Sequence, residues 1–300
     1  MVGQAVSPAS TPRPAGETAC PTYKRRMNDD HNQSVLRFER VTVRFEDTAA
    51  LDDLSFEALQ GETRIIFGAA GSGKTVLLKT AIGLEKPDDG RVYVFGNDIT
   101  RMPEQELFRI RSKAGVLFQE GGLFDSLTIE ENVGYPLENL EECRVPPDEI
   151  HKRVEETLRF VELEQTLEKY PSELSGGMRR RVGIARAVVT EPELVLYDSP
   201  TAGLDPITAY TIIALILKER DLKNTTTLLA TNRYQDGHFL ATNRFNPETG
   251  RAEAVGEEDE GALRTTFMVL RQGKLVFEGS LAELDASTDP YVSKFVRREE

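Results

Sequence analysis

The sequence predicts an α/β protein in which a mainly parallel β-sheet carries helices on its faces. Short apolar segments alternate along the chain with longer segments whose apolar residues recur at helical spacing. A glycine-rich stretch at 68–75 stands between such a strand and a helix, and the strand at 194–198 ends in a carboxylate, Asp198. Ligands of such sheets bind beyond the carboxyl ends of the strands. The glycine-rich stretch and Asp198 both lie at such ends, so together they predict a single binding site there.

The strand predictions rest on alternating polarity and on short apolar runs that are flanked by turn residues. Residues 36–45 alternate apolar and polar side chains, which is typical of a half-buried strand. A Lys-Pro-Asp-Asp-Gly turn at 86–90 precedes the fourth strand, and Gly273 lies in the turn of a predicted hairpin. In chain order, the predicted strands are 36–45, 54–59, 64–67, 91–95, 115–119, 194–198, 225–230, 266–270 and 274–278.

The helix predictions rest on apolar residues three or four positions apart. Ile150, Val154, Leu158 and Val161 have this spacing, and most of 128–170 is expected to be helical. The predicted helices are 76–82, 148–162, 178–189 and 208–218.

The stretch at 68–75 fits the phosphate-binding loop pattern G-x-x-x-x-G-K-[ST]. Glycines let the backbone curl until successive N–H groups point at phosphate oxygens, and the following helix adds its positive N-terminal end. Lys74 can reach the β- and γ-phosphates, and the Thr75 hydroxyl can ligate Mg²⁺. The alternative is a glycine-rich turn that matches by chance. The predicted ATP-binding residues are Gly68, Ala69, Ala70, Gly71, Ser72, Gly73, Lys74 and Thr75.

Composition and charge narrow the possible functions. The 300 residues allow one large domain or two small ones, with the 39% hydrophobic content of an ordinary globular protein. A formal net charge of −13 argues against nucleic-acid binding. No run approaches about 18 apolar residues, so the sequence predicts no membrane span. Cys20 and Cys143 have no ligand spacing and are expected to be reduced thiols of a cytosolic chain.

Residues 1–33 are expected to form a disordered tail. They are rich in Pro, Ser and Thr and lack the apolar core of a signal peptide. Met27 stands just before the globular pattern, and we hypothesise that the native chain begins there. N-terminal sequencing of the native protein that returned Met1 or Val2 would contradict this hypothesis.

A second anion-binding motif, Leu-Ser-Gly-Gly at 174–177, opens the predicted helix at 178–189. It puts a serine hydroxyl and two glycine N–H groups at a helix N-terminus. The alternative is an ordinary helix with Ser175 as its N-cap. With the phosphate loop, Gln119 and the strand that ends at Asp198, in this order and spacing, the motif resembles the signature of ATP-binding cassette (ABC) ATPases.

The resemblance covers about residues 35–285. It implies a phosphate-loop ABC ATPase fold, with a RecA-like core, an N-terminal antiparallel β subdomain and a helical signature subdomain at about 120–180. The ABC ATPase domain would then be 34–285, and 286–300 a C-terminal tail. In this family two chains pack head to tail, and each ATP lies between one chain's phosphate loop and the other's signature. The expected partner is a second ABC ATPase chain, and we expect the pair to be a homodimer. The ATP bound to the partner would contact the signature residues Ser175, Gly176 and Gly177.

The resemblance assigns further roles one position at a time. Phe45 falls where an aromatic ring stacks on adenine, although a core phenylalanine at a strand end is the alternative. Gln119 matches the residue that ligates Mg²⁺ and links the nucleotide to the membrane partner; its alternative is a polar strand end. Asp198 matches the carboxylate that holds Mg²⁺. The loop at 202–205 matches the one that crosses the dimer interface, where Asp205 can also cap a helix.

Two positions depart from the family pattern. Ser199 stands where the family has a Glu that polarises the attacking water, and Asn232 stands where it has a His that contacts the γ-phosphate. A serine hydroxyl is no general base near pH 7, and an asparagine lacks imidazole proton chemistry. His238 lies six residues later, on a predicted helix, as a weak substitute. The catalytic positions are therefore Lys74, Gln119, Ser199 and Asn232.

These departures leave two hypotheses about hydrolysis. The chain is either a slow ATPase, in which positioning, Lys74 and Mg²⁺ supply most of the stabilisation, or a nucleotide-gated regulatory module that scarcely hydrolyses ATP. Pairing with a different cassette chain that carries a complete site is a third case. A single-turnover assay separates the first two hypotheses.

Two segments resemble the ATPases of Mla/Mce-type lipid transport systems. One is the loop at 121–133, and the other is the segment at 289–296. This likeness implies transport of phospholipid or another hydrophobic molecule, with a lipid-binding periplasmic component as an indirect partner. Generic packing of helices and turns is the alternative. The stretch at about 245–264 is expected to be an acidic loop insertion, with its acidic cluster at 257–260.

The implied cellular role is that of a peripheral subunit on the cytoplasmic face of the inner membrane, which energises a polytopic membrane permease. A soluble ABC protein of repair or translation is the competing class. Such proteins typically carry a long coiled coil within the cassette or two cassettes in one chain, and neither feature is present in this sequence.

Overall fold

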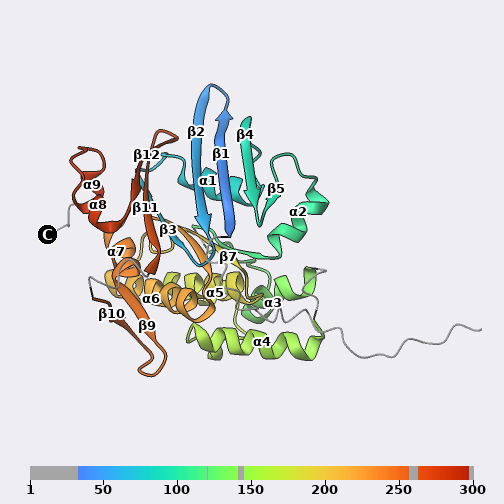
Figure 1. Ribbon diagram of the computed structural model, residues 1–300. Helices are drawn as coiled ribbons and strands as arrows, with labels where there is room; N and C mark the ends of the chain where they lie inside the picture. The colour runs from blue at the N-terminus through green and yellow to red at the C-terminus, as the bar shows by residue number, and fades with distance from the viewer. Residues whose placement is uncertain (1–32, 120, 141–144, 257–262, 297–300) are drawn as a thin grey trace, which may run out of the picture.

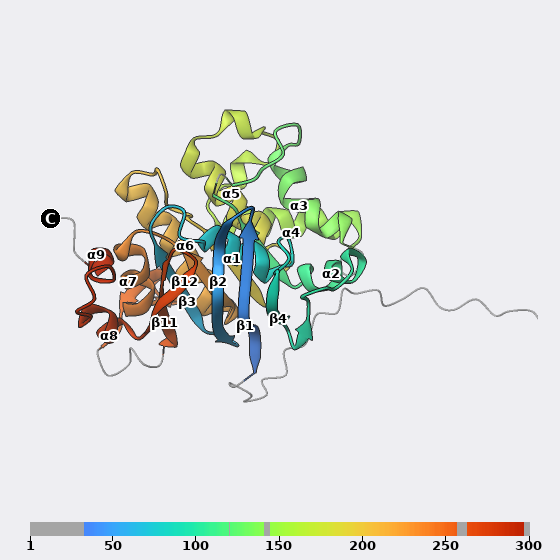
Figure 2. The same cartoon turned by 90° about the horizontal axis from the view of Figure 1, so that it is seen from above.

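The computed structural model describes residues 33–119, 121–140, 145–256 and 263–296. The predicted α/β fold is confirmed. Figure 1 shows an antiparallel sheet (blue and blue-green) above a larger sheet, with a layer of helices below it, and Figure 2 shows the same layers from above. Both cysteines and most of the predicted N-terminal tail lie outside the described residues.

The first layer is an antiparallel sheet with the strand order β2-β1-β4-β5. The rings of Phe38 and Phe56 lie opposite each other on β1 and β2 and stack with 4.8 Å between their centroids. One face of this sheet supplies part of the hydrophobic core, which explains the alternation in the sequence. Its strands are β1 (Ser34–Phe45), β2 (Thr48–Leu59), β4 (Asp89–Val94) and β5 (Asn97–Asp98).

Within the described ranges, six strands form the central sheet, in the order β12-β11-β3-β8-β7-β6. The strands from β11 to β6 run parallel, and β12 pairs antiparallel with β11 at the edge. β3, β7 and β8 are buried at every position because both faces of the sheet are covered. The strands are β3 (Thr63–Gly68), β6 (Ala114–Leu117), β7 (Leu194–Asp198), β8 (Thr226–Ala230), β11 (Thr265–Arg271) and β12 (Lys274–Gly279).

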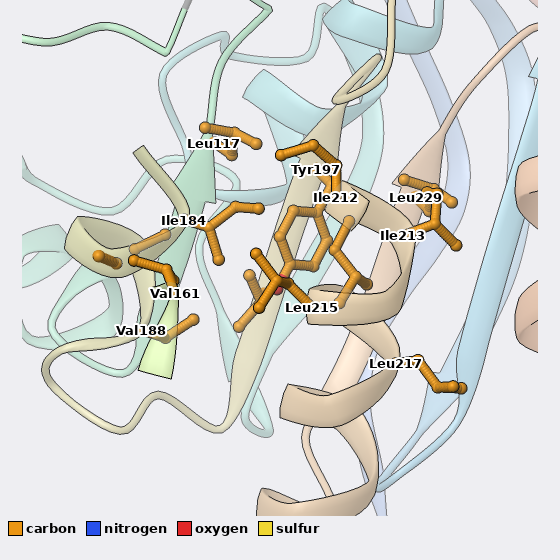
Figure 3. Close-up of a cluster of buried hydrophobic side chains, with 14 of the residues drawn as sticks. Leu117, Val161, Ile184, Val188, Tyr197, Ile212, Ile213, Leu215, Leu217 and Leu229 are labelled. Atoms are coloured by element: carbon orange, nitrogen blue, oxygen red, sulfur yellow. The ribbon is translucent and has the colours of Figure 1, made fainter. Parts of the chain in front are cut away.

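Two clusters of buried apolar side chains lie on opposite faces of the central sheet. Along β3, Ile65 and Phe67 belong to one cluster and Ile66 to the other, as the alternation of a strand requires. Figure 3 shows part of the first cluster, in which Ile212 of helix α6 (Pro206–Lys223) and Tyr197 of β7 are fully covered. Burying one such side chain contributes roughly 1.5–3 kcal/mol, so packing holds α6 against the sheet.

The predicted helices at 148–162, 178–189 and 208–218 correspond to α4, α5 and a longer α6. Helix α6 begins two residues earlier than predicted because the Asp205 carboxylate accepts the N–H groups of Ile207 and Thr208. The helices are α1 (Lys74–Ala81), α2 (Glu104–Arg111), α3 (Ile129–Asn139), α4 (Pro147–Phe160), α5 (Gly176–Val188), α6 (Pro206–Lys223), α7 (Tyr234–Thr242), α8 (Leu281–Asp285) and α9 (Ser293–Val296), with 3₁₀ turns at Glu164–Thr166 and Pro171–Glu173.

The stretch expected to be a loop at about 245–264 contains part of a hairpin, formed by β9 (Asn243–Asn246) and β10 (Arg251–Ala254). The Asn246 side chain organises its turn: the carbonyl oxygen accepts the N–H of Glu248 at 2.8 Å, and the amide donates to the Glu253 carboxylate at 2.9 Å. The acidic cluster at 257–260 lies outside the described residues.

The C-terminal segment packs against the first strand of the nucleotide-binding motif. Phe295 stacks on Phe67 of β3 with 6.0 Å between ring centroids, and Val292 is fully buried. Thus residues 289–296, expected to be a tail, lie against the core as far as they are described. No described helix is long and apolar enough to cross a membrane.

Candidate functional site

The predicted phosphate loop connects β3 to α1 and depends on glycine at specific positions. Gly71 and Gly73 have φ angles of +75° and +106°, which side chains rarely adopt. A Cβ on Gly73 would lie 2.3 Å from the carbonyl oxygen of Ala50 on β2, and one on Gly68 would lie 2.7 Å from that of Leu270. The loop is therefore fitted tightly between the two sheets. Its N–H groups and the start of α1 offer an anion site.

Lys74 opens α1, and its side chain lies along the loop. Its ammonium group donates hydrogen bonds to the carbonyl oxygens of Gly68 at 2.6 Å and Ala69 at 3.0 Å. Burial lowers the pKa of Lys74, and the nearby Asp198 carboxylate opposes that shift. The charged group is thus held next to the loop, where phosphate oxygens would bind.

Asp198 and Thr75 meet beside the phosphate loop. Asp198 ends β7 and is buried, and its carboxylate accepts the Thr75 hydroxyl at 2.7 Å. Gln119 follows β6, whose Leu117 pairs with Tyr197, so Gln119 and Asp198 follow neighbouring parallel strands at the same end. Hydroxyl, carboxylate and amide oxygens are the ligands that Mg²⁺ prefers, so this donor set fits the ion.

Ser199 and Asn232 follow the carboxyl ends of the neighbouring strands β7 and β8. The Ser199 N–H donates to the Ala230 carbonyl at 2.8 Å, and its hydroxyl donates to Asp198 at 3.2 Å. Asn232 is exposed. His238, the weak substitute, sits one helical turn into α7, and its ring packs against Tyr234 with 5.4 Å between centroids. The two departures from the family pattern therefore follow adjacent strands.

The signature motif begins α5. Ser175 is the N-cap, and its hydroxyl accepts the N–H of Met178 at 3.3 Å, so the capping alternative also holds. A Cβ on Gly177 would lie 2.4 Å from the Thr208 side chain at the start of α6, so glycine lets the two segments approach closely. Ser175 and Gly176 are exposed. The motif is accessible to a second chain and rests directly on the segment that follows the predicted interface loop.

Phe45 ends β1, at the turn to β2, and its side chain is 47% exposed. A core phenylalanine at this position would be covered, so its exposure favours a surface that stacks on a base. The next strand, β2, carries the carbonyl of Ala50 that approaches Gly73. Phe45 and the phosphate loop are thus connected through β2.

Tyr291 is a residue at the phosphate loop that the sequence did not indicate. Its hydroxyl accepts the Ala69 N–H at 3.3 Å and donates to the Leu270 carbonyl at 3.1 Å. The Arg271 guanidinium lies over its ring, 5.2 Å from the centroid. The hydroxyl thus joins the loop to β11.

Tyr291→Phe is expected to weaken ATP binding about two- to tenfold. The substitution removes a bridge worth about 0.5–1.5 kcal/mol while keeping the ring that packs on Phe295. Calorimetric titration with ATP measures the effect. Tyr210→Phe is the matched control, because Tyr210 lies on α6 with 57% exposure. Equal affinities of the two variants would contradict a role for the hydroxyl at the loop.

A phosphate loop at the start of α1 and a second anion-binding motif at the start of α5 define a nucleotide-binding ATPase of the phosphate-loop class. The family model described as "ABC transporter" matches residues 51–202, which is more than half of the chain. The chain therefore belongs to the ABC transporter family and is one of its ATP-binding ATPase subunits.

Named relatives and solved structures agree with this family. The chain is 34% identical over 304 residues to the methionine import ATP-binding protein MetN of Corynebacterium efficiens, covering 94% of this chain and 82% of that protein. It is 37% identical to a probable ribonucleotide transport ATP-binding protein of Mycobacterium leprae, covering 84% and 73%. It spans less of other methionine-import proteins, for example 57% of the one from Bifidobacterium longum.

Among solved structures, the ATP-binding cassette MJ0796, a dimer in a post-hydrolysis state bound to ADP and Pi, superposes with a TM-score of 0.67. It is 28% identical and covers 82% of this chain and 98% of that one. The names of the two similar proteins state methionine import and ribonucleotide transport, so they do not support the Mla/Mce-type lipid transport prediction.

Proposed function

We propose that this chain is the energy-coupling subunit of an ABC transporter and works as a head-to-tail homodimer with Mg²⁺-ATP bound at its interfaces. The observation that carries the proposal is the presence of two anion-binding helix starts, at Lys74 and at Gly176, in one chain of this family. Thr75, Gln119 and Asp198 would hold Mg²⁺, and Phe45 would stack on adenine. Hydrolysis is slow, because Ser199 and Asn232 replace the usual Glu and His.

The membrane partner is a polytopic permease, which places the chain on the cytoplasmic face of the inner membrane. Exposed aromatic side chains that follow Gln119 in the sequence support this partner. Phe124 and Tyr135 are about 40% exposed, and their rings lie 4.9 Å apart. Next to them is a cavity of about 240 Å³ with Tyr135 and Arg186 in its lining. Exposed aromatic side chains of this kind are enriched at protein interfaces.

The names of the relatives favour a small solute such as methionine as the transported molecule, with a substrate-binding protein as a further partner. A hydrophobic molecule is the second candidate, which the likeness of 121–133 and 289–296 to lipid-transport ATPases favours. A lipid-binding periplasmic component would then replace the solute-binding protein. Uptake of labelled methionine by cells with and without this chain separates the two.

Purification of the N-terminally tagged chain from detergent-solubilised membranes tests the proposal. Recovery with a polytopic membrane protein in stable stoichiometry supports an energy-coupling subunit. Recovery without such a partner, together with ATP-dependent dimerisation, would instead support the nucleotide-gated regulatory module.

A further inference from the structure

A buried carboxylate that no predicted role uses lies at the start of α7. Asp236 is 3% exposed, and one of its oxygens, Oδ2, accepts the hydroxyl groups of both Thr201 and Thr231. The Thr231 bond is 2.9 Å long, and both threonines are fully buried. Arg233 Nε lies 3.6 Å from the other oxygen. Burying a carboxylate is costly unless its bonds are made, so this arrangement is specific.

The position of Asp236 is fixed by its neighbour. A Cβ on Gly237 would lie 2.9 Å from Ile65 and 3.0 Å from both Phe67 and Phe267. The first turn of α7 therefore lies directly on β3 and β11. The carboxylate cannot follow a moving loop without unpacking α7 from the sheet.

The two threonines belong to different parts of the nucleotide site. Thr231 directly follows β8, donates its N–H to the Ile66 carbonyl at 3.0 Å and directly precedes Asn232. Thr201 directly precedes the predicted interface loop at 202–205, and its carbonyl accepts the Leu204 N–H at 3.2 Å. Asp236 thus ties the interface loop to the segment that carries Asn232.

The signature motif of the same chain rests on that interface loop. The Arg180 guanidinium donates to the Ala202 carbonyl at 3.4 Å. A Cβ on Gly176 would lie 4.0 Å from Leu204, and Gly177 packs on Thr208. A continuous set of contacts therefore runs from the signature, through the interface loop and Asp236, to Asn232.

We propose that Asp236 is a positioning residue that couples the two nucleotides of the dimer. The inference rests on the proposed head-to-tail dimer, in which the signature contacts the partner's ATP and Asn232 faces the chain's own ATP. ATP bound next to Asn232 would then hold the interface loop of that chain in place through the Thr201–Asp236–Thr231 bridge. The signature that rests on this loop would in turn be positioned for the partner's ATP. Binding of ATP to an isolated chain does not depend on it, whereas ATP-dependent dimerisation does.

The test compares Asp236→Ala and the Thr201→Val/Thr231→Val double variant with the wild-type chain. Binding of a fluorescent ATP analogue to the dilute monomer and the dimer fraction by sedimentation in Mg²⁺-ATP are both measured. We expect monomer affinities within about twofold of the wild type and dimerisation weakened about tenfold or more, since two buried hydrogen bonds are lost. Asp236→Asn keeps a carbonyl oxygen for both hydroxyls and should rescue dimerisation to within about threefold.

Thr225→Val is the matched control, because Thr225 is a fully buried threonine that precedes β8 at the opposite end from Thr231. If Thr225→Val weakens dimerisation as much as the test variants do, the effect comes from lost protein stability, and the inference is overturned. Variants that dimerise like the wild type would also overturn it. Should Asp236→Ala not fold, the threonine pair decides. A wild-type chain that shows no ATP-dependent dimer contradicts the proposed function itself.

Discussion

Ser199→Glu is expected to raise the rate of ATP hydrolysis about 10²–10⁴-fold. A glutamate carboxylate can polarise the attacking water near pH 7, which a neutral hydroxyl cannot do without a partner base. The position is suitable, because Ser199 directly follows Asp198 and its N–H bond to Ala230 holds the backbone. Its φ angle is already +50° with a side chain present, so glutamate adds no new backbone strain. Phosphate release at saturating Mg²⁺-ATP measures the rate.

Ser199→Gln is the matched control, since glutamine has the length of glutamate but cannot accept the proton. The hydrolysis rate of the glutamate variant should exceed that of the glutamine variant by nearly the whole factor of about 10²–10⁴. Adding Asn232→His to the glutamate variant should raise the rate again, because a hydrogen-bonding group to the γ-phosphate is restored. Equal hydrolysis rates for the glutamate and glutamine variants would mean that the site lacks other catalytic groups besides a general base. The site would then serve as a nucleotide switch.

Gly73→Ala is expected to weaken ATP binding by more than about 100-fold. The Cβ would lie 2.3 Å from the Ala50 carbonyl oxygen, which belongs to β2 and cannot move away without disturbing the first sheet. The loop must shift instead, and the N–H groups of Ser72 to Thr75 no longer converge on one phosphate. Fluorescence titration with an ATP analogue measures the affinity, and circular dichroism establishes that the variant is folded.

Gly71→Ala is the control for backbone strain alone. Gly71 has a φ of +75°, but a Cβ there meets no atom within 4 Å. The substitution Gly71→Ala therefore costs only the strain of a left-handed backbone, about 1–2 kcal/mol. It should weaken ATP binding by a factor at least tenfold smaller than Gly73→Ala does. Equal losses at both glycines would show that strain, and not the contact with β2, fixes the loop.

The nucleotide-binding core could be predicted because its signals are local. The phosphate loop is a short run between an apolar strand and a helix, and Asp198 directly follows buried strand residues. The parallel register then brings Asp198 and Thr75 to the same end of the sheet, where their side chains are 2.7 Å apart. The family signature at 174–177 added the second motif.

The parts that could not be predicted depend on contacts distant in the chain or on weak local patterns. Tyr291 touches Ala69 from 222 residues away, and Asp236 touches Thr201 from 35 residues away. Helix α2 has Pro103 at its N-cap position, so it lacks the Ser, Thr, Asp or Asn cap that usually marks a helix start. The β9–β10 hairpin is mostly polar, and its apolar Phe245 and Ala252 pack on the core.

The bridge from Tyr291 to Ala69 also has a consequence for biosynthesis. A ribosome adds about 5–20 residues per second, so the 222 residues between the two take roughly 10 to 45 s to appear. Strand β3 likewise waits for β8 and β11, which pair with its two sides. During this interval the nascent chain carries a complete phosphate-loop sequence without the partners that hold it in shape. Nucleotide binding thus becomes available only after Tyr291 has been added to the nascent chain.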